Sequence, residues 1–181
     1  MRRSREETAR TRQSAVEAAS RLFRERGIES VSVGEIMAAL GMTAGGFYRH
    51  FESKEALAAE ACAAAFATSY FVREPAGSAA EMLRRYLGKT HRDAPSAGCP
   101  LPALSSDMAR QPAAVRRAYT AGVRDMIAQV EQLAPGADSK ALLAGMVGAL
   151  AIARAVDDDE LSASILRETK GFWLRALEER S

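Results

Sequence analysis

An all-α fold is the class that this sequence predicts, and three observations support it. Apolar residues recur at intervals of three and four along most of the 181-residue chain, which is the spacing of amphipathic helices. No segment shows the strict apolar–polar alternation of a half-buried strand. Alanine is abundant, and the six prolines are scarce inside the periodic segments. With 48% hydrophobic residues, the chain can bury a substantial core.

The first predicted helix runs from about Thr8 to Arg26. Its apolar stripe follows the spacing i, i+4, i+7 and i+8 and consists of Ala15, Val16, Ala19, Leu22 and Phe23. Gly27 is expected to end the helix, because glycine adopts the left-handed backbone that closes helices. The preceding residues 1–12 hold five arginines and two glutamates, and we interpret them as a mobile basic arm. A frayed, solvated chain end is the alternative interpretation.

The stretch from residue 32 to residue 51, SVGEIMAALGMTAGGFYRHF, organises the rest of the chain. Its first half predicts a short helix in which Ser32 and Glu35 form a capping box. Gly41 supplies the left-handed residue that ends this helix. Thr43 is placed to cap a second helix, which must be short because Gly45 and Gly46 both disfavour helix by about 1 kcal/mol relative to alanine.

The second short helix has two dissimilar faces. Phe47 and Phe51, four residues apart, form a face to be buried, whereas small, aromatic and cationic side chains form the outer face. Such an outer face suits the major groove of DNA, so the pattern predicts a recognition helix. Arg49 is expected to contact a base or a phosphate, and Tyr48 a phosphate. For His50, DNA contact and a packing or capping role both stay open.

A fourth helix is expected from Ser53 to about Phe71, connecting this module to the downstream chain. Ser53 is its cap, and Lys54 lies in the first turn, where a cation opposes the helix dipole. We therefore interpret Ser53, Lys54 and the helix amino terminus as a phosphate clamp. Beyond a break at 75–78, the pattern predicts a loop at 91–102 and helices at 79–91, 103–110, 112–133, 139–156 and 160–179.

Charge is unevenly distributed, although the whole chain has a net charge of only +2. Residues 1–51 contain nine arginines and six glutamates, whereas the remaining 130 residues carry a net charge of −1. A modest positive excess at one end fits phosphate contact by a small module, with a solvated surface as the alternative. The overall charge by itself implies no general affinity for polyanions.

The chain is expected to be soluble and cytoplasmic, without a membrane partner. The amino-terminal residues contain no apolar stretch of signal-peptide length. The most apolar run, 142–156, is too short for a membrane span and contains Arg154. Two cysteines do not make a disulfide framework, which favours a reducing compartment.

No metal, cofactor or catalytic site is predicted. Cys62, His91 and Cys99 are the residues from which a metal or redox site would be built, but neither their spacing nor their number resembles a zinc motif. Buried free thiols are the better interpretation of both cysteines. Paired carboxylates, a nucleophile elbow, a phosphate loop and a metal-binding helix motif are all lacking, so we do not expect an enzyme.

The residues quoted above resemble the TetR/AcrR family of bacterial transcriptional regulators. The resemblance rests on the first helix at 11–27, on VSVGEIMAALGMT at 31–43, on GFYRHF at 46–51 and on SKEAL at 53–57, and it covers about a third of the chain. The remainder resembles the family more weakly, in helix number, in length and in the segment GCPLPAL at 98–104.

The resemblance implies a three-helix helix-turn-helix DNA-binding domain at 1–52 and a larger helical effector-binding and dimerisation domain at 53–181, with about nine helices in all. It implies a homodimer on a near-palindromic operator in double-stranded DNA, released by an unknown small-molecule effector. Transferred position by position, it places DNA contacts at Ser32, Thr43, Ala44, Gly45, Tyr48, Arg49, His50 and Lys54. Gly34 departs from members that carry a base-reading side chain there.

Two further sets of residues are candidates in the larger domain. Aromatic, sulfur-containing and apolar residues that could line an effector pocket are Phe66, Tyr70, Tyr86, Cys99, Leu104, Met108, Tyr119 and Met126. Wide apolar stripes on the last two helices predict either domain core or a two-fold four-helix bundle, and we favour the bundle. Its candidate interface residues are Leu143, Met146, Val147, Leu150, Ile165, Phe172 and Trp173.

The function expected from the sequence is therefore a ligand-responsive, DNA-binding transcriptional repressor. Activation instead of repression stays open, because DNA binding alone does not determine whether transcription increases or decreases. The alternatives are a redox- or metal-responsive regulator and a small all-helical enzyme.

Overall fold

The computed structural model describes residues 5–179, and within this range all regular secondary structure is helical, without a strand, as predicted. The described residues form ten α-helices and one 3₁₀ helix, two elements more than the nine helices expected. The elements are α1 (Arg5–Arg26), α2 (Val33–Ala38), η1 (Ala44–Arg49), α3 (Lys54–Ala67), α4 (Tyr70–Arg73), α5 (Ala79–Tyr86), α6 (Lys89–Asp93), α7 (Pro100–Met108), α8 (Ala113–Leu133), α9 (Ser139–Ala155) and α10 (Asp159–Glu178).

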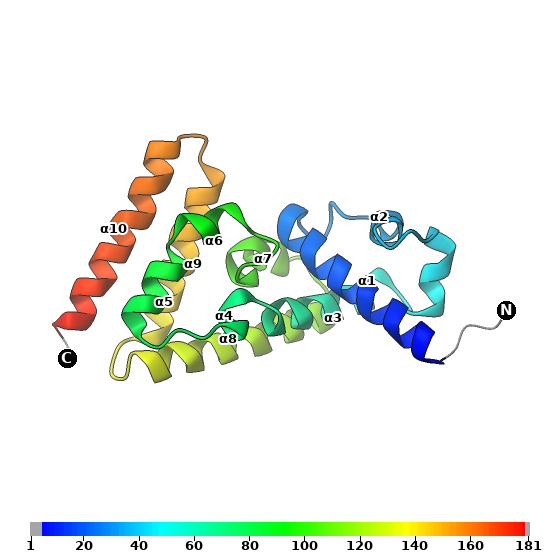
Figure 1. Cartoon of the computed structure of the whole chain (residues 1–181), viewed down its shortest axis with the longest axis horizontal. Helices are drawn as coiled ribbons and strands as arrows, with labels where there is room; N and C mark the ends of the chain where they lie inside the picture. The colour runs from blue at the N-terminus through cyan, green and yellow to red at the C-terminus, as the bar shows by residue number, and fades with distance from the viewer. Residues whose placement is uncertain (1–4, 180–181) are drawn as a thin grey trace.

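The helices form an elongated molecule with a small module at one end (Figure 1). Helices α1, α2 and η1 make this module, and α3 leads from it into the larger group of helices, where it runs along α8. Helices α9 and α10 form an antiparallel pair at the opposite end. This arrangement is an amino-terminal helix-turn-helix domain followed by a helical carboxy-terminal domain.

The contact between α3 and α8 is unusually close and depends on a glycine. A Cβ atom at Gly122 would lie 2.3 Å from the ring of Phe66, far inside van der Waals distance. The Phe66 ring also packs edge-on against Tyr119, with 5.8 Å between ring centroids. The absence of a side chain at Gly122 thus allows the Phe66 ring of α3 to pack directly against the backbone of α8.

Two predicted helices are each broken in the structure, which accounts for the extra elements. The helix expected up to Phe71 ends at Ala67, and a separate turn, α4, follows. The helix expected at 79–91 ends at Tyr86, because the chain turns at Gly88, where a Cβ atom would lie 2.9 Å from the carbonyl oxygen of Arg84. Helix α6 then begins at Lys89.

The long loop predicted at 91–102 is also shorter than expected. Helix α6 extends to Asp93, and α7 begins at Pro100 rather than at Ala103. Pro100 and Pro102 both lie in the first turn of α7, where amide groups have no intrahelical acceptor and proline costs nothing in hydrogen bonding. The prolines therefore open this helix instead of excluding it.

Hydrogen bonds fasten the amino-terminal module to the larger domain. The Arg24 Nη1 atom donates to the carbonyl oxygen of Gly98 at 2.9 Å. In the segment after α1, the amide of Ile28 donates to the Asp107 carboxylate at 3.0 Å. The Gln111 side chain donates to Glu29 at 2.8 Å. The end of α1 and its following segment are consequently held by α7 and its flanks.

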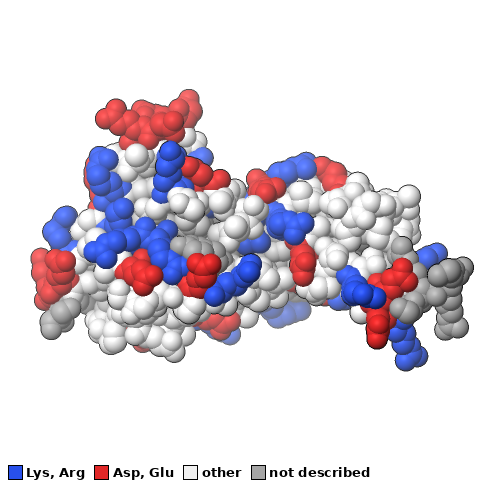
Figure 2. All heavy atoms as spheres, in the orientation of Figure 1, with Lys and Arg blue, Asp and Glu red and all other residues white. Residues whose placement is uncertain are grey.

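None of the described helices combines the length and the apolarity that a membrane crossing requires. Charged side chains are unevenly spread over the face drawn in Figure 2. The turn between α9 and α10 forms an acidic tip, and basic side chains gather below it over the larger domain. The face over α2 carries few charges in this view.

Candidate nucleic-acid interface

Helix α2 begins with the predicted capping box. The Ser32 hydroxyl accepts from the Glu35 amide at 3.2 Å, and the Glu35 carboxylate accepts from the Ser32 amide at 2.8 Å. Glu35 also pairs with Arg26 at 2.7 Å, which ties the end of α1 to the start of α2. Hydrogen bonds from Ser32, followed by the contact with Arg26, lower the pKa of Glu35 to about 2. The carboxylate is therefore ionised at neutral pH.

A tight turn follows α2. Gly41 has a φ of +69°, the left-handed conformation predicted for it, and its amide donates to the carbonyl oxygen of Ala38 at 2.9 Å. The amide of Met42 returns to the carbonyl oxygen of Met37 at 2.9 Å. These hydrogen bonds fix the direction in which the next element leaves.

That next element, η1, is a 3₁₀ helix of six residues, which agrees with the short helix predicted here. Phe47 is fully buried and its ring stacks on Phe51 with 5.4 Å between centroids. Tyr48 packs edge-on against Phe47 at 5.2 Å, yet it is 74% exposed. The two phenylalanines thus hold one face of η1 in the core while Tyr48 stands on the surface.

The outer face of η1 consists of the residues predicted to face DNA, and Thr43, Ala44, Gly45, Tyr48 and Arg49 are all exposed. Nothing lies within 4 Å of where a Cβ atom of Gly45 would be, so the backbone is open to close approach. Thr43 holds the cap position but makes no side-chain capping hydrogen bond, contrary to its predicted capping role. Its hydroxyl is not used to cap η1.

His50 differs from these residues because it is half-buried at the end of η1. Its ring is tilted against Phe51 at 6.5 Å between centroids, and its carbonyl oxygen accepts from Arg12 at 3.2 Å. Of the two roles left open by the sequence, this geometry favours packing.

Arg12 has a role that the sequence did not indicate. It was assigned to a mobile arm, but α1 already begins at Arg5, and residues 1–4 of that arm lie outside the described residues. Its guanidinium binds Glu60 of α3 through two hydrogen bonds of 2.6 and 2.5 Å and lies 4.7 Å from the centroid of the Phe51 ring. The hydrogen bond to Glu60 raises the pKa of Arg12. Arg12 therefore positions the end of η1.

The start of α3 is occupied by its own side chains. Ser53 accepts from the amide of Ala56 at 3.2 Å as the predicted cap. A hydrogen bond from Ser53, together with the backbone amide, lowers the pKa of Glu55. Glu55 thus already places a negative charge at the helix end where the sequence predicted a phosphate clamp. Lys54, in the first turn, is half-buried beside it.

The positive excess of the amino-terminal module is smaller at its surface than its composition suggests. Arg12 and Arg26 are engaged with Glu60 and Glu35, and Arg24 is buried. Among the described arginines of the module, Arg49 is the one on the exposed face of η1. Any electrostatic attraction at η1 therefore depends heavily on that side chain.

The predicted pocket residues do not gather around one cavity. Tyr86 and Met126 line an apolar cavity of about 200 Å³ between α8 and the segment after α4. Phe66 and Met126 line a neighbouring one of about 360 Å³ between α3 and α8. Cys99, Leu104 and Met108 are buried and line neither, and Tyr119 hydrogen-bonds Ser105 at 2.5 Å. The side chain of Tyr70 lies outside the described residues.

Phe71 and Gln129 were missed by the sequence-based list of pocket residues. Phe71 lines the smaller cavity and packs on Tyr86 at 4.9 Å between centroids, whereas Gln129 lines both cavities. Helical periodicity offered no means of separating these residues from other members of the same stripes.

His91 is held by the backbone. Its Nε2 accepts from the amide of Cys99 at 3.0 Å, so its Nδ1 donates to the carbonyl oxygen of Tyr86 at 2.8 Å. Burial lowers the pKa of His91 to about 4 and raises the pKa of Cys62 to about 12 and that of Cys99 to about 11. Both ring nitrogens are thus occupied, and both buried thiols are protonated at neutral pH.

The predicted dimer residues divide into two groups. Leu143, Met146 and Leu150 are buried within the protomer and belong to its core, so their assignment to an interface is corrected. Val147, Ile165 and Trp173 are half-buried against the same core, and a Cβ atom at Gly145 would lie 2.7 Å from the Trp173 ring. Phe172 is 57% exposed, and Ile152 of α9 and Leu161 of α10 are also exposed on this helix pair.

These observations define a class of protein: a helix-turn-helix module, with a short exposed second element, carried on a helical domain that contains apolar cavities. Residues 15–61 match the family model described as bacterial regulatory proteins, tetR family. Over these residues, about a quarter of the chain, the amino-terminal module matches the TetR/AcrR family of transcriptional regulators.

Individual relatives agree with this assignment. Over 59 residues the chain is 42% identical to the HTH-type transcriptional regulator AcrR of Shigella flexneri, covering 33% of this chain and 27% of that protein. The matches to curated relatives thus span about a quarter of those proteins' length.

Solved structures show the fold over nearly the whole chain. The reduced form of NemR from E. coli has a TM-score of 0.72 at 19% identity, covering 90% of this chain and 94% of that one. AibR, solved in complex with isovaleryl coenzyme A and operator DNA, has a TM-score of 0.59 at 18% identity, covering 89% and 96%.

Proposed function

We propose that this protein is a homodimeric, sequence-specific DNA-binding repressor that leaves its operator when a small molecule enters its larger domain. The observation that carries the proposal is η1, whose buried Phe47 fixes an exposed face of small, aromatic and cationic residues. We divide the chain at residue 52 into the DNA-binding domain and the effector-binding and dimerisation domain. Such a regulator would act in the cytoplasm.

In this proposal η1 enters the major groove of an operator half-site. Arg49 donates to a guanine edge or to a phosphate, and Tyr48 donates its hydroxyl to a phosphate. Thr43, Ala44 and Gly45 allow the η1 backbone to approach the base edges closely. Ser32 and Lys54 contact phosphates on either side, and His50 contributes mainly by packing.

Few side chains are left to read bases directly. Gly34, Ala44 and Gly45 carry little or nothing beyond the backbone, so Arg49 and Thr43 are the main candidates for base readout. The remaining specificity would come from the shape and deformability of the operator. We therefore expect a modest penalty for most single base changes and a larger one at the Arg49 contact.

The proposed dimer buries the exposed apolar face of α9 and α10. Gly148 has nothing within 4 Å of where its Cβ atom would be, and Ile152, one turn further along α9, is 55% exposed. Leu161 and Phe172 of α10 are 47% and 57% exposed. A two-fold axis through this face would form a four-helix bundle and place the two η1 elements about 34 Å apart, one DNA turn, or slightly more.

The proposed effector site is the pair of apolar cavities beside α8, which Met126 and Gln129 both line. Their combined space lies within the range of about 300–1,000 Å³ that is common for small-molecule sites. The structure of AibR, with isovaleryl coenzyme A and operator DNA bound, supports a ligand-responsive regulator as the working analogy.

DNA binding is tested by selecting duplexes from a random pool with the full chain and titrating the selected duplex by fluorescence anisotropy at fixed salt. Arg49→Ala should weaken binding about ten-fold or more, because a bidentate base contact contributes about 1–3 kcal/mol. The matched control is Arg84→Ala, an exposed arginine on α5. Equal affinities of the two variants, or no enriched sequence, would contradict the proposal.

Dimerisation is tested by analytical ultracentrifugation at micromolar protomer concentration. The wild-type chain should sediment as a dimer, and Phe172→Glu should shift it toward monomer, because a charge would be buried in the bundle. Ala113→Glu, at the exposed start of α8, is the control. A monomeric wild-type protein would overturn this part of the proposal.

A further inference from the structure

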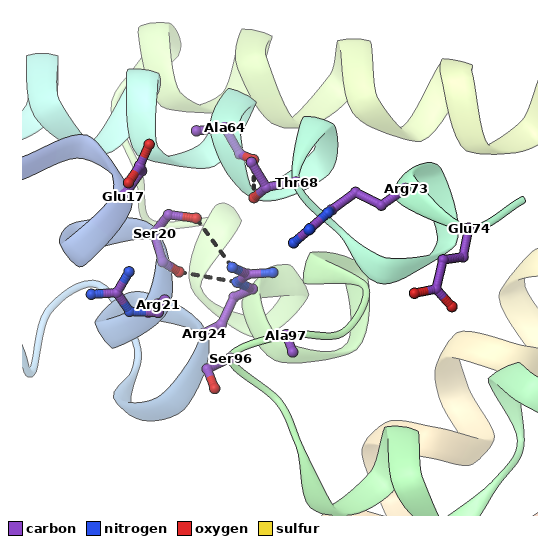
Figure 3. Close-up of a pocket in the computed structure, with 10 residues that line it drawn as sticks. All are labelled: Glu17, Ser20, Arg21, Arg24, Ala64, Thr68, Arg73, Glu74, Ser96 and Ala97. Carbon is purple, nitrogen blue, oxygen red and sulfur yellow. Dashed lines mark hydrogen bonds between the residues drawn. The ribbon is translucent and has the colours of Figure 1, made fainter. Parts of the chain in front are cut away.

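A polar cleft lies between the two domains and shares no lining residue with η1 or with the two apolar cavities. It has a volume of about 480 Å³ and lies among α1, the end of α3, α4 and the segment before α7 (Figure 3). Three arginines and two glutamates line it, whereas the cavities beside α8 are mainly apolar. Neither the helix-turn-helix nor the proposed effector cavities account for these charges.

Arg24 is the central residue of this cleft. It is only 6% exposed, and it makes no ion pair with any residue in the range 5–179. Its guanidinium donates to the carbonyl oxygens of Ser20 and Gly98 at 3.1 and 2.9 Å and, at 3.4 Å, to the Ser20 hydroxyl. A guanidinium has five N–H donors, so part of its capacity remains for a ligand. Burial lowers the pKa of Arg24, which reflects the cost of its charge here.

A second guanidinium converges on the same space. Arg73 of α4 extends across the cleft toward Arg24 in Figure 3, and within the described chain it has no carboxylate partner. Two arginines that face one another repel unless an anion lies between them. Arginine pairs in a partly buried setting are well suited to carboxylate and phosphate groups, which accept two parallel hydrogen bonds from one guanidinium.

The carboxylates of the cleft do not neutralise this pair. Glu17 accepts from Gln13 at 3.0 Å, and Glu74 lies 3.8 Å from Arg85. Within residues 5–179, neither carboxylate forms an ion pair with Arg24 or Arg73. The small side chains of Ser96 and Ala97 leave the space between these two arginines open on the remaining side.

We propose that this cleft is a second ligand site, which takes a small organic anion bearing a carboxylate or phosphate group between Arg24 and Arg73. The anion neutralises the buried guanidinium and joins α1 to α4. Because Arg12 and the segment after α1 set the position of the helix-turn-helix, an anion in the cleft stabilises one orientation of α1 against the larger domain. This regulatory consequence rests on the proposed function, whereas the binding itself does not.

The test uses the full chain and needs no DNA. Citrate, glycerol 3-phosphate and the neutral control glycerol are titrated by isothermal calorimetry at ionic strength held constant with sodium chloride. We expect saturable binding of at least one anion and none of glycerol. Comparing citrate with the phosphate ester separates the carboxylate and phosphate sources. No saturable binding of either anion would overturn the proposal.

Variants locate the binding in the cleft. Arg73→Gln, at an exposed position, should weaken anion binding about ten-fold, whereas Arg84→Gln on α5 should leave it unchanged. Ala97→Glu places a carboxylate at the cleft and should abolish binding without requiring a change at buried Arg24. Circular dichroism checks that each variant is folded. Equal affinities of Arg73→Gln and Arg84→Gln would refute the site, and DNA titration of the same variants tests the proposed function separately.

Discussion

Arg12 provides a direct test of how the recognition element is held in place. We predict that Arg12→Ala destabilises the fold although Arg12 lies at the surface of α1. The substitution removes a bidentate ion pair to Glu60, a guanidinium lying 4.7 Å from the Phe51 ring centroid and a 3.2 Å hydrogen bond to the carbonyl oxygen of His50. All three interactions connect α1 to the residues that end η1 or follow it.

The expected magnitude follows from the exposure of these groups. The Arg12 and Glu60 side chains are 42% and 40% exposed, so their ion pair contributes no more than about 1 kcal/mol. The cation–π contact contributes about 0.5–1 kcal/mol and the hydrogen bond about 0.5–1.5 kcal/mol. Because the three share one side chain and are not additive, we expect a total loss of about 1.5–2.5 kcal/mol.

The assay is thermal unfolding followed by circular dichroism at a fixed protomer concentration, since dimerisation would make Tm concentration-dependent. For a chain of this size the expected loss lowers Tm by about 3–10 °C. The control is Arg10→Ala, an exposed position on the same helix. A double-mutant cycle with Glu60→Ala should give a coupling of about 0.5–1 kcal/mol. Equal Tm values for Arg10→Ala and Arg12→Ala, or strict additivity in the cycle, would refute the reasoning.

Two further predictions concern the larger domain. Burial holds the pKa of folded His91 at about 4, below its ordinary value of 6.5, so the unfolded chain binds more protons between these values. The stabilisation due to neutral His91 is therefore complete above pH 6.5 and is lost as pH falls toward 4. Urea unfolding across this range should show a steeper loss in wild type than in His91→Gln, and parallel curves would contradict the assignment. Gly122→Ala should destabilise by about 1–3 kcal/mol, because its Cβ atom would lie 2.3 Å from the Phe66 ring. Gly171→Ala, which meets only the movable Arg175 side chain, should be neutral or slightly stabilising, and equal effects of the two would show that α3 and α8 can separate at little cost.

Much of the helix-turn-helix could be predicted because its determinants are local. The capping box at Ser32 and Glu35, the left-handed Gly41 and the buried pair Phe47 and Phe51 are all set by residues within a few positions of one another. Caps, glycine conformations and helical periodicity depend on backbone geometry that is the same in every protein. These features could therefore be predicted without knowing which helices pack against this segment.

The sequence predicted less about the larger domain, where apolar stripes occur on several helices. Periodicity identified Met146 and Phe172 as members of apolar faces, but the structure buries the first and exposes the second. The structure also distributes the predicted pocket residues over two cavities and the closed core. A repeating pattern states which residues share a face, and it does not state which helix covers that face.

By itself, then, the sequence determined that the chain is helical, where most helices begin and end, and which residues form the exposed face of η1. Only the tertiary structure decided which arginines remain at the surface. Arg12 and Arg24 look alike on α1, yet one holds η1 through Glu60 and the other is buried beside Gly98. Each contact joins residues at least 48 positions apart, and such pairings depend on how helices pack rather than on any local pattern.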